Sequence, residues 1–265
     1  MLRVDKLLVE QGHADTRARA QTLIKSGAVE VLMGDHWFVV TRPAARYASD
    51  ATFRIQAHAA LRYVSRGGLK LEGALKAAKL NVSGLRCLDV GQSTGGFTDC
   101  LLQHGAREVV GVDVGHDQLH PRLKAHPQVI ALEGINARKL SEALTDNGIN
   151  KHFDLAVMDV SFISQKLIAQ ELSQCLRPGG TLVTLVKPQF ELGPDALNAK
   201  GVVKTPERFA DLELSMRHLY TALNFQVQHY APSPIRGGDG NREFLLIARS
   251  TPDGPGDASQ DTPSG

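Results

Sequence analysis

The stretch Leu88-Asp89-Val90-Gly91-Gln92-Ser93-Thr94-Gly95-Gly96-Phe97-Thr98-Asp99 decides the fold of this chain. Residues 86–90 form a short apolar run typical of a buried strand, a turn of small residues follows, and residues 96–104 have a helical pattern. Glycines let such a turn bend sharply and let a ligand lie against it, near the N-terminus of the helix. A second strand pattern at 109–113 ends on Asp113, about twenty residues on, where a doubly wound sheet carries its ribose-binding acid. The sequence therefore predicts a ligand site at this strand, turn and helix.

The composition of the turn indicates which kind of ligand it binds. Its spacing is not the dinucleotide pattern Gly-x-Gly-x-x-Gly, because the second glycine, which lets a pyrophosphate approach, is missing. Asp89 adds a carboxylate at the strand end, which repels a pyrophosphate and suits a cationic ligand with a free amino group. We therefore expect S-adenosylmethionine and disfavour a nicotinamide dehydrogenase. Another nucleotide site in an α/β fold, or a turn without a ligand, remains the alternative.

Length and composition describe an ordinary globular protein. The 265 residues, 42% of them hydrophobic and 22% charged, predict one or two domains, and a net charge of +2 excludes a polycation. Cys87, Cys100 and Cys175 are isolated, without the spacing of a zinc site, so we expect reduced core thiols, a cytoplasmic location and no metal. The chain shows no signal-peptide pattern and no apolar run of membrane-spanning length, so we also expect no membrane association.

Positive charge gathers in one part of the chain. Between residues 51 and 86, Glu72 is the only acidic residue, against seven bases: Arg54, Arg62, Arg66, Lys70, Lys76, Lys79 and Arg86. Such a stripe can bind a phosphate backbone, and it can equally be a solvated helix face.

Changes in pattern divide the chain into four parts. Residues 1–57 have two short helices and a hairpin around Gly34-Asp35, residues 58–68 form a linker, and residues 69–250 alternate strands and helices. The expected strands lie near 86–90, 108–113, 128–132, 154–159, 180–187, 225–231 and 243–249. This alternation predicts an α/β domain with a mainly parallel sheet and helices on both faces. Residues 251–265 offer almost nothing to bury and are expected to be disordered.

The N-terminal part resembles an S4 RNA-binding domain. Three segments carry the resemblance: Arg3-Val4-Asp5-Lys6-Leu7-Leu8, Thr16-Arg17-Ala18-Arg19-Ala20-Gln21, and Ile24-Lys25-Ser26-Gly27-Ala28-Val29. The resemblance implies a small α+β unit whose helix pair presents Arg3, Arg17, Arg19 and Lys25 to structured RNA. A packed helix pair with solvated arginines is the alternative.

Four further segments extend the resemblance to about Ala248. They are Arg62-Tyr63-Val64-Ser65-Arg66-Gly67-Gly68-Leu69-Lys70-Leu71, Met158-Asp159-Val160-Ser161-Phe162, Leu185-Val186-Lys187-Pro188-Gln189-Phe190-Glu191, and Pro234-Ile235-Arg236-Gly237-Gly238-Asp239-Gly240-Asn241-Arg242-Glu243-Phe244. Together with the S4-like start, they resemble the hemolysin A-type (TlyA) family of ribosomal RNA 2′-O-methyltransferases, whose catalytic domain is FtsJ-like. The resemblance implies a Rossmann-like, seven-stranded class I methyltransferase sheet, S-adenosylmethionine as cofactor, and ribosomal RNA or ribosomal subunits as partner. It also implies that Arg62 and Arg66 contact RNA, and that the acceptor is cytidine in small and/or large subunit RNA. Tyr63 stands where relatives have tryptophan.

The family's catalytic tetrad falls on Lys70, Asp159, Lys187 and Glu243. A ribose 2′-hydroxyl is a weak acid that must lose its proton as it attacks the methyl sulfonium. A lysine can serve as the base when a neighbouring ammonium and partial burial favour its neutral form. We therefore predict Lys187 as the base and Lys70 as the second cation, with the two carboxylates orienting them.

The remaining site residues follow from the expected sheet. The family's binding turn falls on Gly91, Ser93, Thr94, Gly95, Gly96 and Phe97. We expect Asp89 to face the amino-acid end of the cofactor, Asp113 to accept from the ribose hydroxyls and Asn136 to meet the adenine amino group. Residues 188–206 could move over the site as a lid or remain a static loop.

Two other function classes stay open on the sequence. A noncatalytic S4-type RNA-binding protein would keep the N-terminal unit without methyl transfer, although the intact tetrad disfavours this class. A membrane-active cytolysin is suggested by the hemolysin label of relatives, but the chain lacks a strongly cationic amphipathic helix. The sequence does not indicate an oligomeric state.

Overall fold

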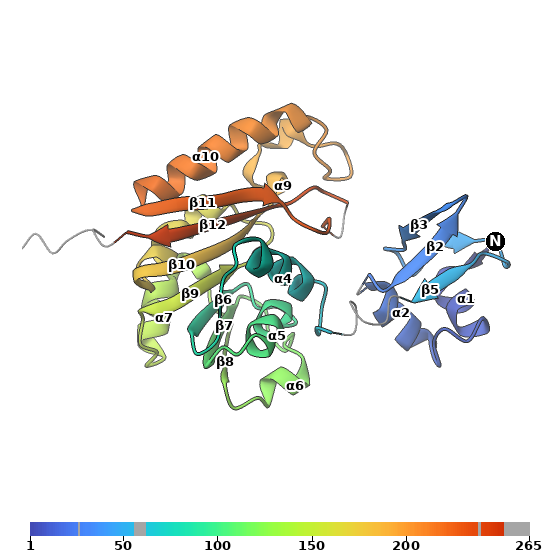
Figure 1. Ribbon diagram of the computed structural model, residues 1–265, viewed down its shortest axis with the longest axis horizontal. Coiled ribbons are helices and arrows are strands. Elements are labelled where there is room, and N and C mark those ends of the chain that lie inside the picture. Colours follow the sequence, from blue (N-terminus) through green and yellow to red (C-terminus); the bar gives the residue numbers. More distant parts are fainter. Residues whose placement is uncertain (26, 56–61, 238–239, 252–265) are drawn as a thin grey trace, which may run out of the picture.

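The computed structural model describes residues 1–25, 27–55, 62–237 and 240–251 (Figure 1). The N-terminal unit contains β1 (Leu2–Arg3), α1 (Val4–Glu10), α2 (Arg17–Lys25), β2 (Val29–Met33), β3 (His36–Val39), β4 (Arg46–Tyr47) and β5 (Phe53–Ile55). Strands β3, β2 and β5 form an antiparallel sheet in that order, and β1 pairs with β4. The two expected helices and the hairpin are confirmed. Strands β1, β4 and β5 were not expected, because two or three residues carry no readable alternation.

A small core holds this unit together. Helix α1 buries Leu7 and Leu8, α2 buries Leu23 and Ile24, and these side chains pack in one cluster with Val29 of β2. Leu7 and Leu8 follow the buried Val4 by three and four residues, and Leu23 and Ile24 follow the buried Ala20 in the same way, which places each set on one face of its helix.

The larger unit begins with α4 (Gly67–Ala77), followed by alternating strands and helices. These are β6 (Arg86–Val90), α5 (Gly96–Gln103), β7 (Glu108–Asp113), α6 (Pro121–Lys124), β8 (Val129–Glu133), α7 (Leu140–Asp146), β9 (Phe153–Met158), α8 (Ala169–Ser173), β10 (Leu176–Val186), α9 (Pro188–Glu191), α10 (Phe209–Ala222), β11 (Phe225–Pro232) and β12 (Phe244–Ser250). Four short 3-10 helices, η1 (Ala137–Lys139), η2 (Gln165–Leu167), η3 (Pro194–Ala196) and η4 (Pro206–Arg208), lie in the connections.

The seven strands form one sheet in the order β11-β12-β10-β9-β6-β7-β8. The five strands from β10 to β8 are parallel, and β12 pairs antiparallel with both β10 and β11. The predicted Rossmann-like α/β sheet is confirmed.

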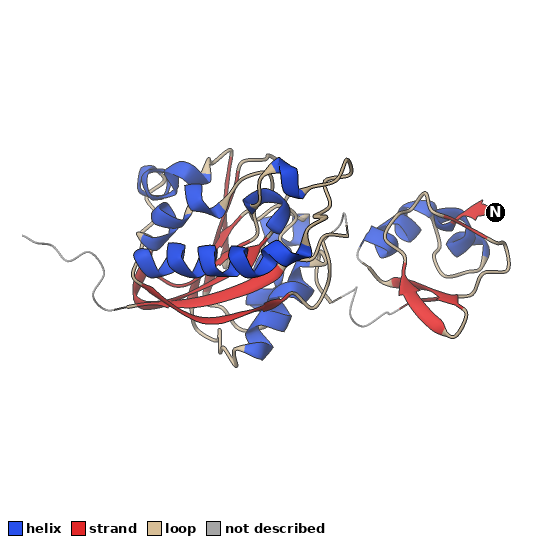
Figure 2. Cartoon of the chain, turned by 90° about the horizontal axis from the view of Figure 1, so that it is seen from above, coloured by secondary structure: helices blue, strands red, loops and turns tan. Residues whose placement is uncertain are grey.

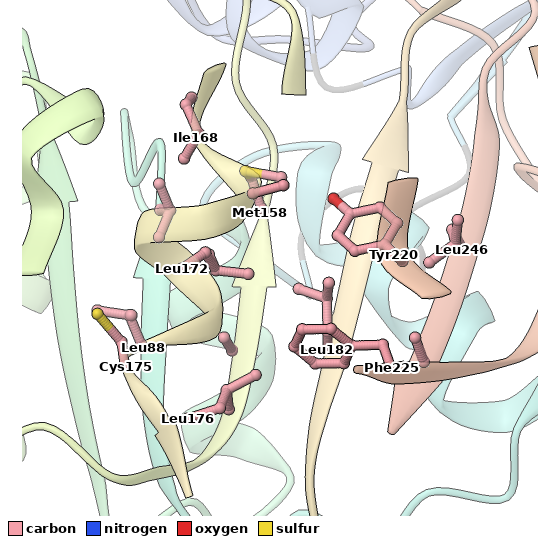
Figure 3. Close-up of a cluster of buried hydrophobic side chains, with 14 of the residues drawn as sticks. Leu88, Met158, Ile168, Leu172, Cys175, Leu176, Leu182, Tyr220, Phe225 and Leu246 are labelled. Carbon is pink, nitrogen blue, oxygen red and sulfur yellow. The ribbon is translucent and has the colours of Figure 1, made fainter. Parts of the chain in front are cut away.

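Helices cover both faces of this sheet, as Figure 2 shows. One buried cluster packs the sheet against α7, α8 and α10, and includes Leu88 of β6, Leu172 of α8 and Tyr220 of α10 (Figure 3). The cluster on the other face packs Cys87 of β6 against α4 and α5. Strands buried on both faces read as continuous apolar runs, which is why the sequence indicated β6 and β7 so clearly.

The topology places candidate catalytic residues at one edge of the sheet. After β6 the chain continues to the neighbouring strand on one side, β7, and after β9 it continues to the neighbouring strand on the other side, β10. Ligands bind at the carboxyl ends of strands beside such a switch point. Asp159 directly follows β9, and Lys187 directly follows β10. At the other end of the chain, β12 includes Ser250, and the Thr251 amide donates to the Asn224 carbonyl. The segment 251–265 was expected to be disordered, but Thr251 is held by this hydrogen bond, and residues 252–265 lie outside the described residues. The predicted boundary between residues 57 and 58 also lies outside them.

Candidate active site

Two buried ion pairs lie at the carboxyl edge of the sheet. Lys187 Nζ lies 2.6 Å from Asp159 Oδ1, and it donates a hydrogen bond of 2.8 Å to Ser161 Oγ. Lys70 Nζ, from α4, donates to Glu243 Oε2 at 2.6 Å. The structure thus brings together, as two pairs, four residues that span the chain.

Both lysines are nearly removed from solvent, since their side chains are each 10% exposed. A buried ammonium without a partner is strongly unfavourable, so each carboxylate compensates one cation. Lys70, Asp159 and Lys187 line one cavity of about 270 Å³. Glu243 does not line this cavity and reaches it through Lys70.

A second cavity, of about 560 Å³, lies beside the first. It is lined by Asp113 and Asn136 among apolar side chains that include Val114, Ile135 and Ile163. The Asp113 carboxylate is oriented by two backbone amides, Ser93 N at 2.8 Å and Gly115 N at 2.7 Å. The Asn136 side chain accepts from the Arg138 amide at 3.0 Å. An oriented carboxylate beside apolar walls fits a ligand that has a ribose and a flat base.

The two cavities share four lining residues: Gly91, Ser93, Asp159 and Ser161. Gly91 has φ +84, and a Cβ at this position would lie 2.5 Å from the Asp159 carbonyl oxygen. A side chain is therefore excluded here both by the left-handed backbone and by the close approach of the next strand end. This contact holds the turn after β6 against the segment after β9, at the boundary between the two cavities.

The remaining residues of the turn differ in whether they line a cavity. Thr94, Gly96 and Phe97 line the first cavity together with the lysines. Gly95 lines neither cavity; it has φ +92, and an added Cβ would collide with Leu123.

Asp89 differs from the expectation that it faces the cofactor. It is completely buried under the turn, lines neither cavity, and its Oδ2 accepts from Thr98 Oγ1 of α5 at 2.6 Å. Its Oδ1 has no hydrogen-bond partner among the described residues. Burial raises the pKa of this carboxyl to about 7. Because side chains alternate along a strand, Asp89 points into the sheet face covered by α4 and α5 and does not reach the strand-end opening.

The expected RNA-binding residues of the N-terminal unit are organised by one buried carboxylate. Asp5 is completely buried and accepts from Arg3, from Arg17 at 2.9 Å and from Gln21 at 2.9 Å. The Arg3 and Arg17 side chains remain 39% and 50% exposed. Arg19 is also exposed.

Lys25, Arg62 and Arg66 lie nearer to the larger unit. Lys25 and Arg66 line the first cavity together with the two buried lysines. Arg62 pairs with Glu72 of α4, and its guanidinium lies 5.5 Å from the centre of the Tyr63 ring. Tyr63 is buried against Gly68, where any Cβ would overlap its ring.

The basic stripe between residues 51 and 86 is largely neutralised by glutamates. Five of its seven bases are in ion pairs: Arg54, Arg62, Lys70, Lys76 and Arg86. This pairing disfavours a continuous phosphate-binding stripe, although these bases are ion-paired and not simply a solvated helix face as the alternative had it.

Residues 188–206 are hydrogen-bonded to the segment that contains Glu243. Leu197 and Val203 form an isolated bridge, and Asn241, 2% exposed, accepts from the Val203 amide and donates to the Gly201 carbonyl, both at 3.1 Å. These bonds support the static alternative over the lid.

Two residues at the site were not predicted. Ser161 lies two positions after Asp159, and its place in the strand-end motif was the signal that could have found it. Phe162 lines the second cavity with a left-handed backbone, φ +63, and is 92% exposed beside Phe190, with ring centres 5.2 Å apart. No sequence pattern predicts an exposed aromatic residue in that conformation.

Comparisons with known proteins agree with this arrangement. The FtsJ-like methyltransferase family model matches residues 63–250, and the S4 domain model matches residues 2–31. The chain is 38% identical over 251 residues to the 16S/23S rRNA (cytidine-2′-O)-methyltransferase TlyA of Mycobacterium tuberculosis, covering 95% of this chain and 91% of that protein. It is 35% identical to Hemolysin A of Brachyspira hyodysenteriae, covering 92% and 98% of the two chains. A solved structure from Streptococcus thermophilus, which carries a hemolysin name, matches with a TM-score of 0.71 and 36% identity over 97% of this chain and 90% of that one.

A membrane span is not found among the described helices, none of which is long and apolar enough to cross a bilayer. The family match extends over most of the chain and includes both ion pairs and, apart from Lys25, the lining residues of both cavities. The chain therefore belongs to the FtsJ-like methyltransferase family, with S-adenosylmethionine as its cofactor and an S4 domain at its N-terminus.

Proposed function

We propose that this chain methylates the 2′-hydroxyl of cytidine in ribosomal RNA, within the small or the large subunit RNA or both. The observation that carries the proposal is the shared boundary between the cavity of Asp113 and the cavity of Lys187 and Asp159. A methyl donor in one cavity and a ribose hydroxyl in the other would meet at Ser161 and Asp159. The names of the TlyA relatives support cytidine in ribosomal RNA as the acceptor.

The second cavity supplies the groups that would hold the cofactor. Asp113 would accept from the ribose hydroxyls, and Asn136 would meet the adenine edge between apolar walls. The Gly91 turn would let the ligand lie directly against the backbone. S-adenosylmethionine, when bound, supplies the methyl group as a sulfonium. Asp89 would act from beneath the turn, through Thr98 and the start of α5.

Lys187 is the proposed base for the 2′-hydroxyl. Asp159 and Ser161 fix its ammonium nitrogen at the cavity boundary, and the hydroxyl proton would pass to that nitrogen once it is neutral. Lys70 adds a second cation to the cavity, and Glu243 compensates it. Correct placement of donor and acceptor supplies much of the rate enhancement, because methyl transfer requires in-line alignment.

The S4 domain is the proposed RNA-binding surface outside the cavity. Arg3, Arg17 and Arg19 present exposed guanidinium groups for phosphate contacts, which position RNA without reading its bases. Lys25 and Arg66, at the first cavity, would contact phosphates close to the acceptor nucleotide. A structured RNA or a ribosomal subunit would then contact both units together.

A methyl-transfer assay with purified protein tests the proposal. The protein is incubated with methyl-labelled S-adenosylmethionine and either naked ribosomal RNA, isolated small subunits or isolated large subunits, and the RNA is digested to nucleosides. We expect label in 2′-O-methylcytidine with at least one substrate. RNA binding without transfer to any substrate would support the noncatalytic alternative, and lysis of red cells would support the cytolysin.

A further inference from the structure

The contacts of Lys187 with Asp159 and Ser161 require a fixed distance between two segments that follow neighbouring strands. Asp159 and Ser161 lie on the segment after β9, whereas Lys187 lies at the junction of β10 and α9. Their contacts of 2.6 and 2.8 Å join these two segments at the cavity boundary. The Asp159 amide still donates to the Val90 carbonyl of β6 at 3.0 Å. Strand pairing does not fix the segments beyond Asp159 and Val186, because both are connections at the sheet edge.

Glu191, the last residue of α9, joins the same two segments from the side away from the cavity. Its Oε2 accepts from Ser164 Oγ at 2.6 Å, and its Oε1 accepts from the Gln165 amide at 2.8 Å. Both oxygens of one carboxylate therefore hold the segment after Asp159 against the helix after Lys187. Neither Glu191 nor Ser164 lines either cavity.

The far end of the segment is anchored to the sheet. Gln165 is 2% exposed; its Nε2 donates to the Leu185 carbonyl at 2.8 Å, and its Oε1 accepts from Tyr220 at 2.8 Å. With Gln165 fixed to β10 and α10, the bonds of Glu191 determine how closely residues 159–165 approach α9. The segment is thus tied at Gln165 and at Ser164, and it presents Asp159 and Ser161 to Lys187.

We propose that Glu191 is a positioning residue that sets the spacing between Lys187 and its partners Asp159 and Ser161. The inference rests on the proposed role of Lys187 as the base. Glutamate suits the position because both neighbouring groups are donors and a carboxylate is acceptor-only. Glu191→Gln removes the charge with almost no change in volume, and Ser164 Oγ can then pair with the amide nitrogen only by changing from donor to acceptor.

The test is the single-turnover rate of methyl transfer across pH, at saturating RNA and S-adenosylmethionine. We compare wild type, Glu191→Gln, Asp159→Asn and the control Glu213→Gln, which removes a carboxylate paired with Arg217 on α10. We expect Glu191→Gln to lower the plateau rate about tenfold, because small displacements of reacting groups are costly. We also expect the midpoint of the acid limb to move in the same direction as in Asp159→Asn, because both variants disturb the contact between Asp159 and Lys187.

Other charged groups near Lys187 are the same in the variant and in wild type. They are Asp159, Lys70 with Glu243, and Lys25 and Arg66 at the cavity wall. A purely structural role for Glu191 would lower the melting temperature and scale the rate equally at every pH. An unchanged midpoint, or a rate equal to that of Glu213→Gln, would overturn the proposal.

A second variant covers the case in which Glu191→Gln does not fold. Ser164→Ala removes the 2.6 Å bond to Glu191 and the 3.2 Å bond that Ser164 Oγ accepts from the Lys166 amide, and it should shift the midpoint in the same direction by a smaller amount. No shift in Ser164→Ala would then overturn the proposal. Failure of the proposed function is distinguishable, because in that case wild type itself shows no methyl transfer.

Discussion

The two units of this chain each contain a completely buried aspartate, and the two aspartates have opposite surroundings. Asp5, in the N-terminal unit, accepts from two guanidinium groups and one amide. Asp89, under the binding turn of the larger unit, accepts from one hydroxyl and has an oxygen without a partner among the described residues. Equal burial therefore does not mean equal electrostatics.

The pKa values of the two carboxyls follow these surroundings. The hydrogen bond from Arg3, with those from Gln21 and Arg17, holds the pKa of Asp5 well below its usual range despite burial. Burial without a cation raises the pKa of Asp89 to about 7. A charged Asp5 keeps two arginines in place, whereas the raised pKa of Asp89 favours its protonated form in acid and up to about pH 7.

The cations of the two units differ in the same way. The guanidinium groups of Arg3 and Arg17 both pair with Asp5, and the two side chains remain 39% and 50% exposed, which leaves them accessible for phosphate contacts. Lys70 and Lys187 are 10% exposed and paired inside a cavity, as a site for proton transfer requires. Under the proposed function, the exposed pair would bind RNA and the buried pairs would carry the chemistry.

Among the variants that test this division between binding and chemistry, Lys187→Ala should have the largest effect. Lys187→Ala should lower the single-turnover rate by about a thousandfold, because a general base typically contributes 10²–10⁴. Binding of RNA and S-adenosylmethionine should change little, since the base acts only in the transition state. Lys166→Ala, an exposed lysine on η2, is the control. Near-normal turnover of Lys187→Ala at neutral pH would assign the base to Asp159 or to water.

A smaller effect is expected at Asp113, on the cofactor side of the cavity boundary. Asp113→Ala should weaken S-adenosylmethionine binding by about tenfold or more, because it removes a charged acceptor and the bonds to Ser93 and Gly115. Titration calorimetry measures the affinity, and Asp117→Ala, an exposed aspartate on the following loop, is the matched control. Unchanged affinity in a folded Asp113 variant would remove this residue from the site.

A several-fold effect on RNA binding is expected in the N-terminal unit. Arg17→Ala combined with Arg19→Ala should lower RNA affinity and make its salt dependence shallower, by about one unit of slope for each phosphate that an arginine no longer neutralises. Fluorescence anisotropy across salt concentrations measures both quantities. Affinity that survives at physiological salt would show that the S4 domain is not the main RNA-binding surface.

The smallest effect on function is expected at Asp89, where the comparison predicts a pH-dependent stability. The ordinary pKa of an aspartate is about 4, so between about pH 4 and 7 the unfolded carboxyl has lost its proton and the folded one retains it. Raising the pH through this window therefore lowers the free energy of unfolding, and the loss is complete above about pH 7. Asp89→Asn cannot ionise and should gain melting temperature relative to wild type, by a few degrees, from about pH 4.5 to 8. A constant difference across pH would contradict the raised pKa.

Much of the fold was predictable from local patterns. Strands β6 and β7 are continuous apolar runs bounded by glycine, and α5 begins where the glycines end, so their positions follow from the sequence. The grouping of the four tetrad residues followed from the family resemblance, whose motifs contain all four, and not from local patterns. Which carboxylate pairs with which lysine was not predictable, because Lys70 and Glu243 are 173 residues apart.

Other features depend on three-dimensional packing. The direction of the Asp89 side chain is set by the alternation along β6, which places it under α5 and away from the opening. The pairing of Arg62 and Lys76 with Glu72 neutralises a stripe that looks basic in the sequence. The bonds of Asn241 to residues 201 and 203 fasten a loop that sequence reasoning left open as a lid.

One paired measurement tests the central claim most directly. RNA affinity and single-turnover rate at saturating RNA are measured together for Lys187→Ala and for the double variant Arg17→Ala with Arg19→Ala. The account predicts a crossed result, in which Lys187→Ala loses rate but retains affinity, and the arginine variant loses affinity but retains rate. A parallel loss of rate and affinity in both variants would contradict the division of binding and chemistry between the two units.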